Sequence, residues 1–190
     1  ALEQASLLTD VRSRVSKALD VEVTRSLRSL AMSHAVFRTH IEPTALGPTG
    51  IDQVVFMLSA NLGEAEQPLH KVASGGELSR VLLSVELAMA AQGQGIGCYI
   101  FDEVDSGMGG QTASTVGRRL AELSRHSQVV CISHLPQIAR LADHHFSVTK
   151  TVAEGRTEAV AAQLDGSGRV AELARMLGDE FASEWMAQVA

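Results

Sequence analysis

The chain has 190 residues, of which 45% are hydrophobic and only 4% aromatic, and its formal net charge is −6. This length suffices for one domain with a sizeable core, and the aliphatic composition favours helices packed on a sheet over an aromatic-rich β-sandwich. An acidic chain without a cluster of Lys and Arg is poorly suited as a main DNA-contact surface. No apolar run approaches the roughly 20 residues that cross a bilayer, and the first residues do not resemble a signal peptide. We therefore expect a cytoplasmic protein.

The first predicted element is a long amphipathic helix from about Ser6 to Ser33, a stretch without Gly or Pro. Its apolar residues recur at steps of three and four: Leu8, Val11, Val15, Leu19, Val23, Leu27 and Leu30. Such a helix is longer than the average of about a dozen residues in globular domains. By itself the stretch fits equally the end of a coiled coil that continues upstream and a long helix packed on the domain surface.

Two strands are predicted next, at about 35–41 and 51–59, joined by the turn-rich string EPTALGPTG. After the polar loop NLGEAEQPLH, a helix is predicted from about Gly76 to Gln92. Its spacing predicts four core-facing residues: Leu78, Leu82, Val85 and Met89.

The remaining chain alternates short apolar strands with helices. The predicted strands lie at 98–101 and 128–133, the helices at 111–124, 136–142 and 169–177, and a hairpin at 146–152 and 158–164 around the string AEGR. Continuous apolar strands indicate a sheet buried on both faces. Cys98 and Cys131 lie inside two of the apolar runs without metal-ligand spacing, so we expect them to be small buried hydrophobes.

Two adjacent carboxylates, Asp102 and Glu103, directly follow the apolar string CYIF. Ligands of open α/β sheets bind at the carboxyl ends of the strands. Asp102 is therefore placed to hold Mg²⁺, directly or through a water molecule, and Glu103 to polarise a water that attacks a γ-phosphate. The alternative is an ordinary strand followed by a polar turn.

The string ASGGE carries a second pattern, in which Ser74 and Glu77 match a capping box at the start of the predicted helix. A capping box does not require Gly75 and Gly76, which lower helix stability. Glycines at these positions let a phosphate approach the N–H groups at the positive end of the helix. The serine can then cap the empty helix and turn to a phosphate when one arrives.

His134 directly follows the strand predicted at 128–133, at the same sheet edge as Asp102. From there a histidine can reach a terminal phosphate, although a histidine at a strand end is also commonly structural. The other histidines show no metal-ligand spacing.

Three strings taken together and in this order, KVASGGELSR, IFDEVDSGMGG and CISHLPQIARLAD, resemble the signature, Walker B and switch-histidine motifs of the SMC and RecN family of ABC-type ATPases. The likeness covers about residues 35–180, and the last two strings and RVAELARMLG resemble the RecN branch. The resemblance implies an α/β fold, the C-terminal lobe of an ATPase head at 34–190, with a mainly parallel sheet, flanking helices and a β-hairpin. Residues 1–33 would be the end of a coiled coil.

The resemblance also implies a role for each matching residue. Signature residues would contact ATP bound to a partner head: Ser74, Gly75, Gly76 and Glu77. Asp102 would bind Mg²⁺, while Glu103 and His134 would be catalytic. Asp105 and Ser106 fall in the D-loop, where the string DSGMG departs from the ALD-like pattern usual in SMC proteins and transporters, so coupling through this loop stays open.

No G-x-x-x-x-G-K-[ST] string, the Walker A loop that cradles phosphates, occurs in the chain. In the SMC-like family that loop lies in an N-terminal segment beyond a long coiled coil, which favours the coiled-coil interpretation of the first helix. We therefore expect half of a head, inactive alone, that binds ATP and Mg²⁺ with its own N-terminal half. A second head would join it in an ATP-dependent homodimer that serves the repair of DNA double-strand breaks at the nucleoid, and other parts of the full-length protein would contact DNA.

Two further functions stay open from the residues alone. A stand-alone Mg²⁺-dependent phosphoesterase or nuclease could use the same polar side chains, namely Asp102, Glu103, Asp105 and His134. It would leave the glycine turn unexplained. A non-catalytic dimerisation module is the other possibility.

Overall fold

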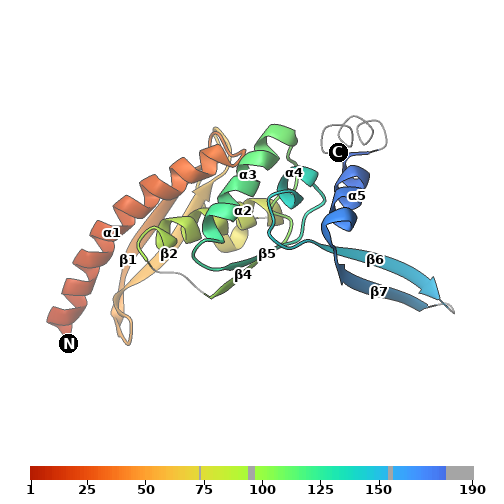
Figure 1. The fold of residues 1–190 in the computed structure, drawn as a ribbon. Coiled ribbons are helices and arrows are strands. Elements are labelled where there is room, and N and C mark those ends of the chain that lie inside the picture. The colour runs from red at the N-terminus through yellow and green to blue at the C-terminus, as the bar shows by residue number, and fades with distance from the viewer. Residues whose placement is uncertain (73, 94–96, 154–155, 179–190) are drawn as a thin grey trace. The chain divides into compact units, whose positions relative to one another are not determined.

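The structure is a computed structural model that describes residues 1–72, 74–93, 97–153 and 156–178. It contains two compact units, Ala1–Ile132 and Ser133–Ala190, each of which is described by itself (Figure 1). Helices and small sheets are mixed in the chain, which confirms the predicted α/β class. Within the described residues no helix is long and apolar enough to span a membrane.

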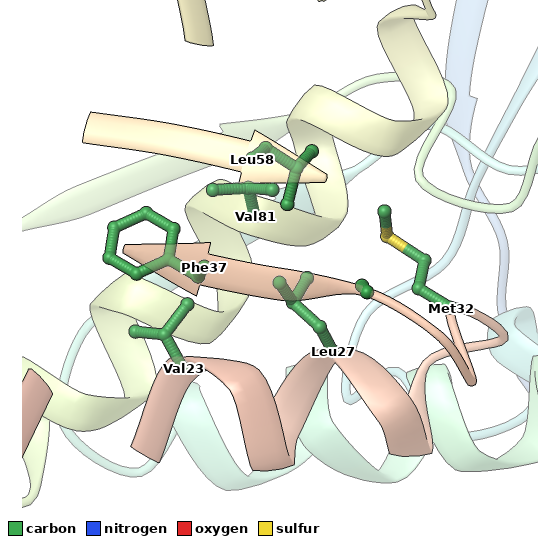
Figure 2. Close-up of a cluster of buried hydrophobic side chains, with 7 residues drawn as sticks. Val23, Leu27, Met32, Phe37, Leu58 and Val81 are labelled. Carbon is green, nitrogen blue, oxygen red and sulfur yellow. The ribbon is translucent and has the colours of Figure 1, made fainter. Parts of the chain in front are cut away.

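The first helix, α1 (Leu2–Ser29), packs on the strands β1 (Val36–Gly47) and β2 (Gly50–Ser59). It begins earlier than predicted and ends four residues earlier, just before Ala31 adopts a left-handed backbone conformation with a φ of 62°. The C-terminal half of its apolar stripe contributes Val23 and Leu27 to the core shown in Figure 2. That cluster comprises Val23, Leu27, Met32, Ala35, Phe37, Leu58 and Val81.

The N-terminal half of the same stripe is open to solvent, since Leu8, Val11 and Val15 are 37%, 44% and 56% exposed. Helix α1 therefore carries two kinds of apolar surface, one buried in the unit and one uncovered within the described residues.

Strands β1 and β2 pair antiparallel, with Val36 opposite Ser59 and Gly47 opposite Gly50. Most of the string predicted as a turn is therefore strand, and only Pro48 and Thr49 separate β1 from β2. Proline and glycine suggested a turn, but β1 is an edge strand, where a proline without an N–H is tolerated. The register shifts between Pro43 and Gly47.

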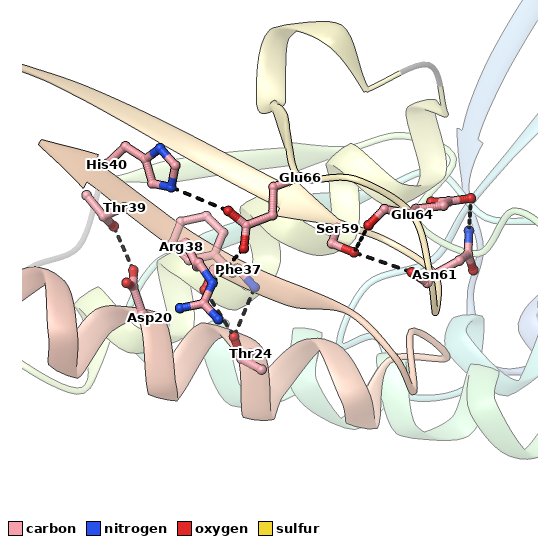
Figure 3. A network of polar contacts seen from close by, with 10 residues as sticks. All are labelled: Asp20, Thr24, Phe37, Arg38, Thr39, His40, Ser59, Asn61, Glu64 and Glu66. Atoms are coloured by element: carbon pink, nitrogen blue, oxygen red, sulfur yellow. Dashed lines mark hydrogen bonds and ion pairs between the residues drawn. The ribbon is translucent and has the colours of Figure 1, made fainter. Parts of the chain in front are cut away.

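Polar contacts fix this sheet to its neighbours (Figure 3). The hydroxyl of Thr24 on α1 accepts from the backbone N–H of Phe37 at 3.0 Å, and Thr39 donates to Asp20 at 2.7 Å. Arg38 pairs with Glu66 at 2.6 Å, just before the short strand β3 (Gln67–Pro68) and the 3-10 helix η1 (Leu69–Lys71), which lie in the predicted polar loop.

Helix α2 (Gly75–Ala90) packs against α1 and α3 (Gly110–Leu123). Its predicted core face is wrong in the first turns, because Leu78 and Leu82 are 43% and 42% exposed. The buried side instead combines the apolar Val81 and Leu83 with polar residues. The carboxylate of Glu86 is buried because it accepts a hydrogen bond of 2.6 Å from the hydroxyl of Tyr99.

Strands β4 (Cys98–Phe101) and β5 (Gln128–Cys131) form a parallel pair. The other described strand pairs are antiparallel, so among the described residues the predicted mainly parallel sheet is limited to this pair. Tyr99 and Phe101 point into the core, whereas Ile100 is 68% and Val130 43% exposed. The prediction of burial on both faces is therefore wrong for the described residues. Cys98 is exposed, so its predicted burial is wrong, whereas Cys131 is half-buried.

The second unit contains α4 (Pro136–Ala139), the hairpin of β6 (Phe146–Ala153) and β7 (Arg156–Gln163), and α5 (Gly166–Leu177). The hairpin is confirmed, and its tip at 154–155 lies outside the described residues. Arg169 on α5 donates to the carbonyls of Ala139, Arg140 and Ala142 at the end of α4. Asp165 caps α5, and the hydrogen bond of 2.6 Å that it accepts from the N–H of Gly168 lowers its pKa.

Candidate functional site

The carboxyl ends of β4 and β5 lie side by side, because Phe101 pairs with Cys131 and the N–H of Ile132 donates to the carbonyl of Phe101 at 2.9 Å. Asp102 and Glu103 follow β4 at this edge, and both are exposed. Asp105 is only 3% exposed. The predicted carboxylates thus occupy the edge where α/β sheets bind their ligands.

The backbone of Glu103 is left-handed, with a φ of 56°. This region costs a residue with a Cβ about 1–2 kcal/mol, and such residues cluster at functional sites when their surroundings hold them. A tight turn follows, in which the N–H of Ser106 donates to the carbonyl of Glu103 at 3.0 Å. The side chain of Glu103 therefore projects from a constrained loop.

The first turn of α2 lies against this loop. A Cβ built on Gly75 would be 2.8 Å from Oε2 of Glu103, and one on Gly76 would be 3.0 Å from the Glu103 carbonyl oxygen and 2.9 Å from Cβ of Ser106. Only glycine allows so close an approach. The fold thus requires Gly76 even without a phosphate, because its neighbours are a backbone carbonyl and a Cβ, whereas the exposed side chain of Glu103 could move away from a Cβ at position 75.

Ser74 caps α2, as predicted, and its hydroxyl accepts from the N–H of Glu77 at 3.3 Å. The structure therefore brings the turn at Ser74–Gly76 and the Asp102–Ser106 loop together in the first unit. His134 is exposed and lies between β5 and α4 in the second unit, and its placement beside Glu103 stays a prediction.

Two polar residues of α2, which sequence reasoning did not single out, hold the loop. The hydroxyl of Ser79 donates to the carbonyl of Asp102 at 2.8 Å, and Nη1 of Arg80 donates to the carbonyl of Ser106 at 3.2 Å. Arg80 is only 8% exposed, and this burial lowers the pKa of its guanidinium, with Glu77 acting in the opposite direction. In the sequence, the feature that could have pointed to Ser79 and Arg80 is their position inside the string KVASGGELSR.

The electrostatic field at this edge is negative. Burial raises the pKa of the Cys131 thiol to about 12, and the charges of Asp105 and Asp102 act in the same direction. Burial by itself disfavours any charge, but the negative field of these two carboxylates favours a cation.

The described residues contain no cluster of three or more His, Cys, Asp or Glu that could hold a metal ion. Mg²⁺ does not need such a cage, because it keeps several waters and binds through one or two carboxylates together with substrate phosphates. The exposed carboxylate of Asp102, in its negative surroundings, fits that role.

Comparison with solved structures defines the class of fold. The chain superposes on the Smc head domain of Pyrococcus yayanosii with a TM-score of 0.61, at 20% identity, over 88% of this chain and 30% of that chain. The Smc head of Pyrococcus furiosus gives a TM-score of 0.55 at 19% identity, over 87% and 40%. At these identities the likeness concerns the fold, which is that of an SMC head.

Sequence comparison then identifies the relatives. The chain is 42% identical to the DNA repair protein RecN of Streptomyces coelicolor and 41% identical to that of Haemophilus influenzae, over 95% of this chain in each case. No protein-family model matches the chain. The chain spans about a third of the length of these relatives, namely 34% and 32%. It is therefore related to RecN along nearly all of its residues, and the predicted resemblance is confirmed.

Proposed function

We propose that the chain is the C-terminal half of a RecN-type ATPase head, which hydrolyses ATP only together with its own N-terminal half and a second head. The observation that carries the proposal is the cluster in the first unit. There the turn Ser74–Gly76 packs against the loop that bears Asp102 and Glu103. An SMC-like fold and the sequence relationship to RecN support the same assignment.

Each residue has a role in this proposal. Asp102 would hold Mg²⁺, which would neutralise charge on the phosphates. Glu103 would accept a hydrogen bond from the attacking water and take its proton. His134 would donate to the γ-phosphate of the same ATP.

The remaining residues would serve the second head. Ser74, Gly75 and Gly76 would present a hydroxyl and N–H groups to the γ-phosphate of ATP held there, at the positive end of α2. Glu77 would keep the turn in place. Asp105 and Ser106 would form the D-loop between the two sites.

An uncovered apolar surface supports the requirement for an N-terminal half. Ile100 on β4, Val130 on β5 and Ile132 directly after β5 are 68%, 43% and 57% exposed. Leu78 and Leu82 on α2 are exposed as well. Apolar surfaces of this kind mark interaction sites. The relatives are about three times as long as the chain and have the residues to cover it.

The uncovered stripe on α1 supports the proposed division into a coiled-coil end at 1–33 and a head lobe at 34–190. Leu8, Val11 and Val15 are spaced by three and four residues, as at the a and d positions of a coiled coil. In the full-length protein we place head dimerisation in DNA double-strand break repair, in the cytoplasm at the nucleoid, with DNA bound mainly by other segments.

The decisive experiment replaces Glu103 by Gln in the full-length protein. Because the amide keeps the shape but cannot take a proton, we expect hydrolysis to fall at least a hundredfold while ATP still binds. Head dimers should then accumulate with ATP and be measurable by light scattering. Glu122→Gln, an exposed change on α3, is the matched control.

Hydrolysis at the normal rate by Glu103→Gln would overturn the assignment. Since packing explains Gly76 but not Gly75, the glycine turn still argues in part against the stand-alone phosphoesterase. Mg²⁺-dependent cleavage of DNA or of a phosphoester by the purified chain would favour that function instead. Failure of a supplied N-terminal half to restore ATPase activity would favour the dimerisation module.

A further inference from the structure

We propose that Ser79 is a positioning residue for Glu103, acting through the peptide group that joins Asp102 to Glu103. This inference rests on the proposed function, in which Glu103 handles the attacking water. It assigns to Ser79 a role distinct from that of the neighbouring glycine turn.

The conformation of Glu103 is set by the two peptide groups that flank it. The carbonyl of Asp102, on the preceding peptide, accepts the 2.8 Å hydrogen bond from Ser79. The carbonyl of Glu103, on the following peptide, accepts from the N–H of Ser106. With both groups held, the rotation about the N–Cα bond of Glu103 stays at its φ of 56°.

A left-handed conformation at a residue with a Cβ needs such support. Without it, the peptide group before Glu103 can rotate toward the extended or right-handed regions that most residues prefer. That rotation changes the direction in which the carboxylate projects. The free-energy cost of the left-handed conformation and the net stabilisation from one hydrogen bond are of similar size. Loss of the Ser79 hydroxyl would therefore shift the conformational equilibrium of Glu103 away from the left-handed region.

The rest of the loop cannot compensate by moving, because its far end is also attached to α2. The buried guanidinium of Arg80 binds the carbonyl of Ser106, and Gly76 lies against the backbone of Glu103. A change at Ser79 therefore acts locally on the Asp102–Glu103 peptide.

The consequence concerns both sites of a head dimer. Helix α2 begins with the turn proposed to contact the ATP of the second head, and one turn later its Ser79 holds the Glu103 of its own head. The same helix thus carries groups for both sites of the proposed dimer.

The experiment compares Ser79→Thr with Ser79→Val in the full-length protein. The two side chains have the same shape, and only threonine has a hydroxyl. We expect Ser79→Val to lower kcat about tenfold, the rate equivalent of one hydrogen bond, with KM for ATP and ATP-dependent dimerisation unchanged. Ser79→Thr should retain most of the wild-type kcat.

Ser84→Ala is the control on the same helix, because the buried hydroxyl of Ser84 has no hydrogen-bond partner among the described residues. Equal kcat values for the Thr and Val variants would overturn the role of Ser79, even if Glu103→Gln traps dimers. If Glu103→Gln hydrolyses ATP normally, the proposed function itself fails. The two failures are thereby distinguishable.

Discussion

The thiol of Cys131 lies at the candidate site in surroundings that oppose a negative charge. Its pKa of about 12 lies well above that of an ordinary thiol, chiefly because of burial and then because of Asp105 and Asp102. A raised pKa keeps the thiol protonated, so at pH 8 only about one molecule in 10⁴ carries the reactive thiolate. Cys98, on β4, is exposed.

We predict that iodoacetamide at pH 8, with a metal chelator present, labels the isolated chain once, at Cys98. Mass spectrometry of the intact chain and its peptides gives the stoichiometry and the position. Cys98→Ser should abolish rapid labelling, while Cys131→Ser should leave it unchanged. Labelling of Cys131 at a rate similar to that of Cys98 would contradict the assigned environment.

Among single residues, the sequence predicted those site residues that belong to a recognisable motif and missed those that do not. Ser74 caps its helix as predicted, and Asp102 and Glu103 lie at the predicted edge. Ser79 and Arg80 were missed because polar residues on a helix normally face solvent, and only tertiary structure gives them backbone carbonyls to bind.

A polar network at the scale of elements joins the N-terminal part of α1 to β2. The side chain of Asp52 is only 4% exposed and pairs with Arg12 at 3.1 Å. The hydroxyl of Thr9 donates to this carboxylate and lies 2.9 and 2.8 Å from its two oxygens. The apolar residues of this part of α1 are largely exposed. The network is therefore a main attachment of α1 at its N-terminal end.

We predict that Asp52→Ala lowers the free energy of unfolding of the chain by about 1–3 kcal/mol, because it removes the acceptor and leaves Thr9 and Arg12 without it. Urea denaturation followed by circular dichroism measures the effect. Glu22→Ala, which breaks the exposed pair with Arg25 on the same helix, should change it by about 0.5 kcal/mol or less. Equal effects of the two changes would exclude this role of Asp52.

Periodicity predicted most helices and strands, since burial of one face gives each element its spacing. It failed where tertiary contacts override local preference. The string around Pro43 pairs as an edge strand instead of turning. On α2 the buried carboxylate of Glu86 is stabilised by a hydrogen bond from Tyr99, a partner that the spacing of residues along the helix does not reveal.

The first unit as a whole leaves one face of β4–β5 uncovered within the described residues, with Ile100 its most exposed apolar side chain at 68%. Under the proposed function, the N-terminal half of the head covers this face. The sequence correctly indicated strands apolar on both sides, but no segment of the described residues buries the second side.

We predict that Ile100→Lys leaves the isolated chain as stable as the wild type but prevents co-purification with a co-expressed N-terminal half. A lysine in a newly formed apolar contact would be buried without a partner. Leu62→Lys, at an 83% exposed loop position, is the control and should co-purify normally. Recovery of the N-terminal half by Ile100→Lys at the wild-type level would count against this interface.

Strands β4 and β5 pair only with each other in the described part of the chain, so each has one open edge. Open edges beside an apolar face are templates for aggregation. Made without its partner segment, such a polypeptide would engage chaperones and proteases before it could accumulate. If the two halves of the proposed head were made separately in a cell, the amount of this chain would therefore fall before the rate of any reaction did. Co-expression of the two halves would restore its abundance first.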